Sequence, residues 1–295
     1  MKLTRREAIS LVGSASIGTW LLANEARGSV KPPALAPGSP ASAERMALID
    51  SFRKRSEGLA GKFEAGRHKS DWVMPYRLYR PSVKGKLPLV LYLHGSGGVG
   101  DDNEKQLGLG NVFGTLTWAL PENQRRFPCY VLAPQTDRGW IHYQADTADG
   151  PARPAAGFGE GARLALEIVD ELRRDSAIDE RRIYVAGQSM GGAGVWNMLT
   201  FRPQFFAAAV ICCGGASFDD GTGSPETPLW NFHGEADKTV PVAISRDRIA
   251  ARRKAGGHPL YTEYPGVDHN VWQWAFTEPG IVKWVFSQVR VARRK

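Results

Sequence analysis

The chain has 295 residues, of which 42% are hydrophobic, and its formal net charge is +8. That much apolar sequence can bury a core, which excludes a wholly disordered, collagen-like or low-complexity chain. Three cysteines in 295 residues exclude a disulfide-stapled scaffold.

Residues 1–26 have the layout of an export signal. The first residues are basic and include the adjacent Arg5 and Arg6. They precede residues 8–23, which are mostly apolar or small and carry no charge. Paired arginines before an apolar stretch resemble a bacterial twin-arginine signal. The alternatives are an ordinary amphipathic N-terminal helix and an uncleaved anchor. The signal predicts an exported protein, periplasmic or secreted, with no stable membrane span after its removal.

Residues 27–45 contain the segment GSVKPPALAPGSPASA, whose composition predicts a flexible linker before a catalytic domain at 46–295. The basic clusters of the chain are scattered and lack the interleaved aromatic residues of a nucleic-acid platform. We therefore expect a solvated basic surface and no nucleic-acid partner.

Strands and helices alternate along the rest of the chain. Apolar runs bounded by turn residues predict strands, and amphipathic stretches predict helices. The predicted strands are 72–81, 87–94, 129–134, 181–187, 205–213, 228–234 and 260–266. The predicted helices are 44–60, 112–120, 159–176, 191–202, 242–257 and 279–291. This alternation predicts an α/β fold, a mostly parallel sheet with helices on both faces, whose ligands bind beyond the carboxyl ends of the strands.

The strongest chemical signal is the sequence Gly187-Gln188-Ser189-Met190-Gly191. It lies between a predicted strand and a predicted helix, the context of a G-x-S-x-G nucleophile elbow. Such a turn is so tight that side chains at the two glycine positions would collide. The alternative is a glycine-rich loop between strand and helix that has no catalytic role. The sequence predicts that Ser189 is a catalytic nucleophile.

A serine hydroxyl needs a base to take its proton, and in this fold the base follows the serine in the chain. Three histidines come after Ser189. His233 ends a strand, which favours a structural role, and His258 lies between a helix and the next strand. His269 follows the strand 260–266 at its carboxyl end and is the predicted base.

The base in turn needs a carboxylate to orient its ring. Asp237 follows the strand 228–234 and is the predicted acid. Asp219 and Asp220 lie in a Gly/Ser-rich loop, where solvation is the simpler role. Asp268 neighbours the base in sequence, which makes the far ring nitrogen awkward to reach.

The segment His94-Gly95-Ser96-Gly97-Gly98 follows another predicted strand. It contains part of a G-x-G-x-x-G pattern, but a dinucleotide site needs a helix that opens at once, and the next residues are polar and broken by glycine. The better interpretation is an oxyanion hole, in which the N–H groups of Ser96 and Met190 bind the developing charge. Gly97 is the alternative donor to Ser96.

Other reactive residues give weaker signals. Cys129, Cys212 and Cys213 lie in apolar runs and are interpreted as buried free thiols. No metal-ligand or phosphate-binding motif is present, so we expect no cofactor and no metal. Trp140 and Trp272 are candidates for stacking on an acyl group or a sugar, although packing roles compete for both.

Several segments of the chain together resemble a known family. They are PYRLYRP, LPLVLYLHGSGGVGDDNEKQL, VLAPQ, IDERRIYVAGQSMGGAGVWNM, FAAAVICCGG, LWNFHGEADKTVPV and YTEYPGVDHNVW. Over residues 72–290 the chain resembles a peptidase/esterase group of α/β-hydrolases, related to polyhydroxybutyrate depolymerases, feruloyl and acetyl xylan esterases and the prolyl oligopeptidase catalytic domain. The resemblance implies an α/β-hydrolase fold with Ser189, Asp237 and His269 at the triad positions.

Three hypotheses about function follow. The first is a serine hydrolase that cleaves carboxylic esters, such as short acyl esters or esters on glycans. The second is a peptidase of the prolyl oligopeptidase type, which the lack of a propeller-like segment disfavours. The third is a hydrolase-like binding protein without catalysis, which the intact set of triad residues disfavours.

Overall fold

We describe residues 40–144, 153–174, 178–215 and 221–290 of a computed structural model. The main sheet contains β1 (Glu64–Lys69), β2 (Val73–Tyr79), β3 (Leu87–Leu93), β4 (Tyr130–Pro134), β7 (Ile178–Gln188), β8 (Ala208–Cys212), β9 (Leu229–Gly234) and β10 (Leu260–Tyr264). Their order across the sheet is β1-β2-β4-β3-β7-β8-β9-β10. The five pairings from β4 to β10 are parallel, and the two involving β2 are antiparallel. A small separate pair joins β5 (Tyr143–Gln144) and β6 (Arg153–Pro154).

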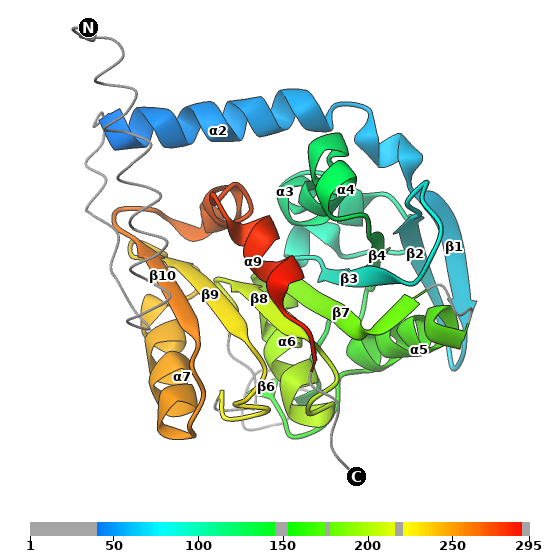
Figure 1. Ribbon diagram of the computed structural model, residues 1–295. Coiled ribbons are helices and arrows are strands. Elements are labelled where there is room, and N and C mark those ends of the chain that lie inside the picture. Colours follow the sequence, from blue (N-terminus) through cyan, green and yellow to red (C-terminus); the bar gives the residue numbers. More distant parts are fainter. Residues whose placement is uncertain (1–39, 145–152, 175–177, 216–220, 291–295) are drawn as a thin grey trace, which may run out of the picture.

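The helices are α2 (Pro40–Ser56), α3 (Asn111–Leu116), α4 (Pro121–Arg126), α5 (Glu160–Arg174), α6 (Met190–Phe201), α7 (Val242–Lys254), α8 (Trp272–Ala275) and α9 (Ile281–Ser287). Figure 1 shows α5, α6 and α7 on one face of the sheet and α2, α3, α4 and α9 on the other. The prediction of an α/β-hydrolase fold, a mostly parallel sheet with helices on both faces, is confirmed. None of these helices is both long enough and apolar enough to cross a membrane.

The central strands are buried on both faces, which explains their unbroken apolar sequence. Side chains alternate between the two faces of a strand. Along β3, Val90 and Tyr92 therefore enter the core under α2, α3 and α9, while Leu89 and Leu91 enter the core above α5 and α6. The sheet thus separates two hydrophobic cores.

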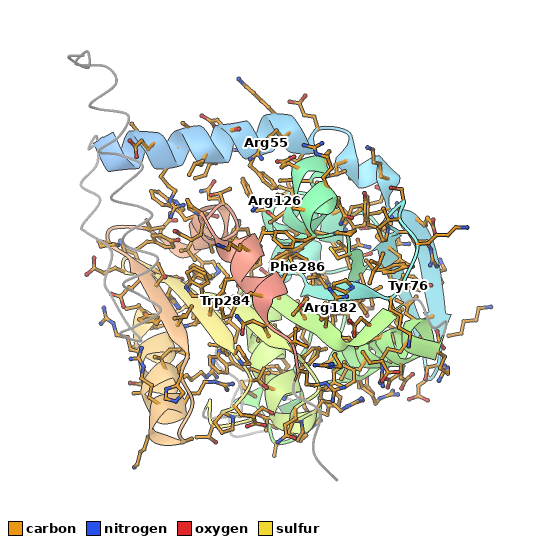
Figure 2. The ribbon with its side chains drawn as sticks, viewed as in Figure 1. Arg55, Tyr76, Arg126, Arg182, Trp284 and Phe286 are labelled. Atoms are coloured by element: carbon orange, nitrogen blue, oxygen red, sulfur yellow. The ribbon has the colours of Figure 1, made fainter. Side chains whose placement is uncertain are left out.

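Helix α9 closes the first of these cores with aromatic rings. Trp284 meets Trp230 of β9 edge to face, with ring centroids 5.4 Å apart. Phe286 meets Tyr184 of β7 in the same way at 5.4 Å, and Figure 2 shows both side chains of α9. Aromatic pairs prefer this geometry, and it holds the last helix against the sheet.

The structure bears on one of two predictions about the N-terminal region. The export signal at 1–26 lies outside the described residues. The linker was predicted to extend to residue 45, but α2 begins at Pro40, so residues 40–45 are helical. Arg45 anchors this start of the helix, because its guanidinium pairs with the buried carboxylate of Glu278 and donates to the Tyr264 hydroxyl.

Candidate active site

Ser189 occupies a strained turn between β7 and α6. Its φ is 52° and its ψ is −117°, a backbone conformation that L-residues rarely adopt. A Cβ on Gly187 would lie 2.4 Å from the carbonyl oxygen of Gly191, and one on Gly191 would lie 2.0 Å from that of Leu93. Both glycines are therefore required by close backbone approach, as the elbow interpretation expects.

The structure brings Ser189, His269 and Asp237 into one chain of contacts. Ser189 Oγ lies 2.9 Å from His269 Nε2, and His269 Nδ1 lies 2.7 Å from Asp237 Oδ2. The three residues follow β7, β10 and β9, whose carboxyl ends share one edge of the sheet because these strands run parallel through β8. Residues far apart in sequence therefore meet.

The Asp237 carboxylate is buried and fixed from several sides. Its Oδ1 accepts hydrogen bonds from the backbone N–H groups of Thr239 (2.9 Å) and Val240 (2.8 Å). His233 Nε2 lies 3.2 Å from Oδ2 and 2.9 Å from the Val240 carbonyl oxygen. Burial lowers the pKa of His233, which favours its neutral form. His233 thus supports the loop that carries Asp237.

Electrostatics favour a proton on His269. Burial of the ring acts to lower its pKa, but Cys213 and Asp237 outweigh that cost and raise the pKa from 6.5 to about 9. Among the described residues, the other candidate carboxylate is Asp268, and it makes a different contact. The Asp268 side chain accepts a hydrogen bond from the Asn270 N–H at 3.0 Å, and Asp219 and Asp220 lie outside the described residues.

The loop after β3 lies against the same edge. Ser96 opens a short 3-10 helix, Ser96–Gly98, and the Gly95 N–H donates to the side chain of the buried Asn111 at 2.9 Å. The Met190 N–H begins α6, and the first N–H groups of a helix have no acceptor within it. A first-turn N–H at the helix N-terminus can stabilise negative charge.

Sequence reasoning did not assign a role to His94, which organises this loop. The ring is fully buried, and Nδ1 lies 2.8 Å from the Gly95 carbonyl oxygen. The Thr136 N–H donates to Nε2 at 3.1 Å. These partners fix the tautomer with the proton on Nδ1. Burial lowers the pKa of His94 from 6.5 to about 4, so the ring is neutral at physiological pH. The position of His94 directly before the glycine-rich loop was the sequence feature that could have indicated this role.

The two candidate tryptophans have different positions. Trp272 is half-buried and meets His269 edge to face, with ring centroids 5.4 Å apart. Trp140 is fully buried, and its indole N–H donates to the His94 carbonyl oxygen at 2.9 Å. The Trp140 ring has no exposed face, so the prediction that it stacks on a substrate is wrong. Gly194 packs against it, which explains why the ring points into the core.

Cys129, Cys212 and Cys213 are buried free thiols, as predicted. No basic neighbour of Cys213 is apparent in the sequence, but the fold supplies one, because the thiol contacts His269. This contact joins segments that are 56 residues apart.

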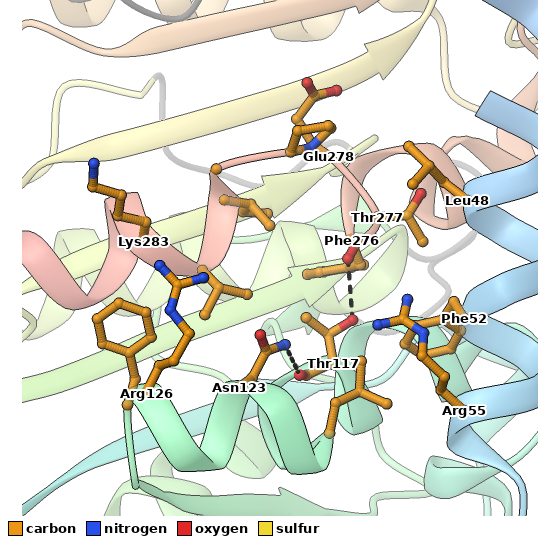
Figure 3. Close-up of a pocket in the computed structure, with 16 residues that line it drawn as sticks. Leu48, Phe52, Arg55, Thr117, Asn123, Arg126, Phe276, Thr277, Glu278 and Lys283 are labelled. Atoms are coloured by element: carbon orange, nitrogen blue, oxygen red, sulfur yellow. Dashed lines mark hydrogen bonds between the residues drawn. The ribbon is translucent and has the colours of Figure 1, made fainter. Parts of the chain in front are cut away.

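A cavity of about 370 Å³ lies elsewhere, between α2, α4 and residues 276–283 (Figure 3). Phe52, Thr117 and Phe276 line it together with the cationic side chains of Arg55, Arg126 and Lys283. Ser189, Asp237 and His269 are not among its lining residues. This cavity is distinct from the contacts described above.

Comparison with known proteins identifies relatives of the chain. A thermostable esterase of known structure is 33% identical, with a TM-score of 0.71, and the match covers 78% of this chain and 64% of that one. The poly(3-hydroxyalkanoate) depolymerase C of Paucimonas lemoignei is 24% identical over 51% of this chain and 41% of its own length. The ferulic acid esterase of Anaeromyces mucronatus shares the fold, at 14% identity and a TM-score of 0.55 over 73% of this chain and 88% of its own.

The match spans less than two thirds of the length of the first two of these relatives. The sequence profile of the phospholipase/carboxylesterase family matches residues 81–278, which include Ser189, Asp237 and His269. The chain belongs to the phospholipase/carboxylesterase family of α/β-hydrolases.

Proposed function

We propose that the protein hydrolyses carboxylic esters, with Ser189 as nucleophile, His269 as general base and Asp237 as the carboxylate that orients the base. The observation that carries this proposal is the unbroken chain of contacts from Ser189 Oγ through His269 to Asp237, at 2.9 Å and 2.7 Å. Family membership and the 33% identical thermostable esterase support it.

The proposed reaction has two halves. Ser189 Oγ attacks the ester carbonyl carbon, and its proton passes to His269 Nε2. The resulting oxyanion accepts hydrogen bonds from the N–H groups of Met190 and Ser96. Collapse of the tetrahedral intermediate breaks the bond to the alcohol, which leaves with the proton held by His269. Water then attacks the acyl-enzyme with help from His269, and the acid is released as the proton returns to Ser189.

The raised pKa of His269 affects the pH range in which we expect the enzyme to be active. A general base accepts a proton only in its neutral form, and the pKa of this ring is raised to about 9. We therefore expect kcat/KM to rise with pH on the alkaline side of neutrality.

We propose short acyl esters as substrates, including acyl groups carried on glycans. Trp272 beside His269 offers a half-buried aromatic face, and Gly110 leaves room for it, since a Cβ there would lie 2.8 Å from the indole nitrogen. Leu109, which precedes Gly110 in the chain, is 78% exposed. Aromatic and aliphatic side chains of this kind suit an apolar acyl or aryl group. Two of the similar proteins are, by their names, a poly(3-hydroxyalkanoate) depolymerase and a ferulic acid esterase.

Ester and peptide substrates separate this proposal from the peptidase alternative. An alkoxide leaves more readily than an amine, and a peptidase must also hold an extended chain. We expect kcat/KM for a short p-nitrophenyl ester to exceed that for a proline nitroanilide peptide, and both to vanish in Ser189→Ala. A peptide value equal to or above the ester value would favour the peptidase. Ester hydrolysis that persists in Ser189→Ala would exclude the proposed nucleophile.

A further inference from the structure

Cys213 lies directly beneath the candidate active site. It follows β8, where its N–H donates to the Phe232 carbonyl oxygen at 2.8 Å, and its side chain is fully buried. Its Sγ lies 3.6 Å from the His269 carbonyl oxygen. The neighbouring Gly215 N–H donates to the Ser189 carbonyl oxygen at 3.3 Å. The segment that carries the thiol thus contacts both Ser189 and His269.

Three kinds of metal ligand converge at this point. Cys213 Sγ, a ring nitrogen of His269 and a carboxylate oxygen of Asp237 all lie within 4.8 Å of one another. Sulfur, nitrogen and oxygen donors of this kind bind Zn²⁺ at about 2.0–2.3 Å, which places ligand atoms of a tetrahedral site about 3–4 Å apart. The ligands therefore need to move by only about 1 Å to close on an ion.

We propose that Cys213, His269 and Asp237 form a binding site for a thiophilic divalent metal ion, Zn²⁺ or Cd²⁺, and that the bound ion inhibits the enzyme. Thiolate and imidazole ligands select such ions over Mg²⁺ or Ca²⁺. The inhibitory consequence rests on the proposed function, whereas the binding itself does not.

The proton balance explains the inhibition. In its neutral form, the one that acts as general base, His269 carries its proton on Nδ1, which faces Asp237, and the ion binds there in place of that proton. The proton of the ring moves to Nε2, which then points an N–H at Ser189 Oγ and cannot accept the hydroxyl proton. The Cys213 thiol loses its proton to solvent as the sulfur–metal bond forms. Binding therefore releases one proton and converts the base into the wrong tautomer.

The charges around the thiol favour this exchange. Burial acts to raise the pKa of Cys213, but hydrogen bonds from Cys212 and His269 lower it below the ordinary thiol value. Cys129, by contrast, is buried against the uncharged Gln124 side chain and the Trp118 carbonyl oxygen, and burial raises its pKa to about 12. Of these two thiols, Cys213 is therefore the one that more readily loses its proton and can bind a metal ion.

The test uses the reduced full chain and two metal ions. Cd²⁺ gives an ultraviolet charge-transfer band when it binds a thiolate, and this readout does not depend on catalysis. We expect one Cd²⁺ per chain with this band, and inhibition of ester hydrolysis by Zn²⁺ that a chelator reverses. In Cys213→Ser the band should disappear, and the Zn²⁺ concentration for half-inhibition should rise at least tenfold.

Cys129→Ser is the matched control, since it removes a buried thiol away from these ligands, and it should keep both the band and the Zn²⁺ inhibition. Ser189→Ala should also keep the band, which separates the metal site from the esterase proposal. An absent band in the wild type, or an unchanged band in a folded Cys213→Ser variant, would overturn the proposal. A Cys213-dependent band in a chain that lacks esterase activity would support the site and refute the proposed function instead.

Discussion

Asp237 carries the charge that defines which nitrogen of His269 holds a proton. Replacing it by Asn keeps the shape of the side chain but favours the wrong ring tautomer, as it does in known Ser-His-Asp triads. We expect Asp237→Asn to lower kcat for ester hydrolysis by about 10⁴-fold. Asp268→Asn is the control, because the Asp268 carboxylate accepts a hydrogen bond from the nearby Asn270 N–H. A larger loss in Asp268→Asn than in Asp237→Asn would reassign the acid.

His94 links pH to stability at the loop that carries Ser96. Its pKa is lowered from 6.5 to about 4 in the folded chain, so below pH 6.5 the unfolded chain binds a proton that the folded chain refuses. Stability should therefore fall as the pH drops from 7 to 4, by about 3 kcal/mol from this residue.

The measurement is the free energy of urea unfolding at both pH values. In His94→Gln the loss between pH 7 and pH 4 should shrink by about that amount. His258→Gln is the matched control, since the His258 ring is exposed and stays hydrated in both states. A wild-type pH dependence retained in full by His94→Gln would show that the buried ring is not its source.

At the scale of residues, the sequence predicted the three members of the contact chain because each follows a strand that ends in a turn. The side-chain orientation of Trp140 was not predictable in this way. Its ring turns inward because Gly194 on α6 leaves space for it and the His94 carbonyl oxygen accepts its indole N–H. The contact between Cys213 and His269 likewise depends on packing between distant segments.

At the scale of elements, the interior strands were predictable because burial on both faces requires continuous apolar runs. The edge strand β1 was missed, since its sequence EAGRHK is charged and mostly exposed. Edge strands often carry such residues, which discourage pairing with other chains. Helix α4 was missed for a related reason, because it has no buried residue and so no apolar periodicity.

The ion pair between Arg45 of α2 and Glu278 leads to a prediction about how this helix is held against the rest of the domain. The Arg45 side chain is 11% exposed and that of its partner Glu278 is 4% exposed, so removing one leaves the other buried without its charge partner. We expect Arg45→Ala to lower the free energy of unfolding by about 3–5 kcal/mol. The control is Arg53→Ala in the same helix, whose pair with Asp50 is exposed and should contribute at most about 1 kcal/mol. Equal effects of the two changes would contradict this anchoring role.

At the scale of the whole molecule, the N-terminal sequence predicts where the enzyme works. Residues 1–45 fused to a reporter should direct it out of a bacterial cytoplasm, and Arg5→Lys together with Arg6→Lys should block that export. Fractionation of cells that express the two fusions provides the measurement. Unchanged export of the double variant would indicate the general secretory route, and retention of the wild-type fusion in the cytoplasm would refute the signal.

The central claim is that Ser189 is an activated nucleophile, and covalent labelling tests it most directly. A fluorophosphonate reacts with a serine only where a base removes the hydroxyl proton, so the intact chain should gain one phosphonyl group, located at Ser189 by peptide mass spectrometry. Labelling should be lost in Ser189→Ala and slowed by orders of magnitude in a folded His269→Ala variant. Absence of labelling in the wild type, or a label on another residue, would contradict the assignment.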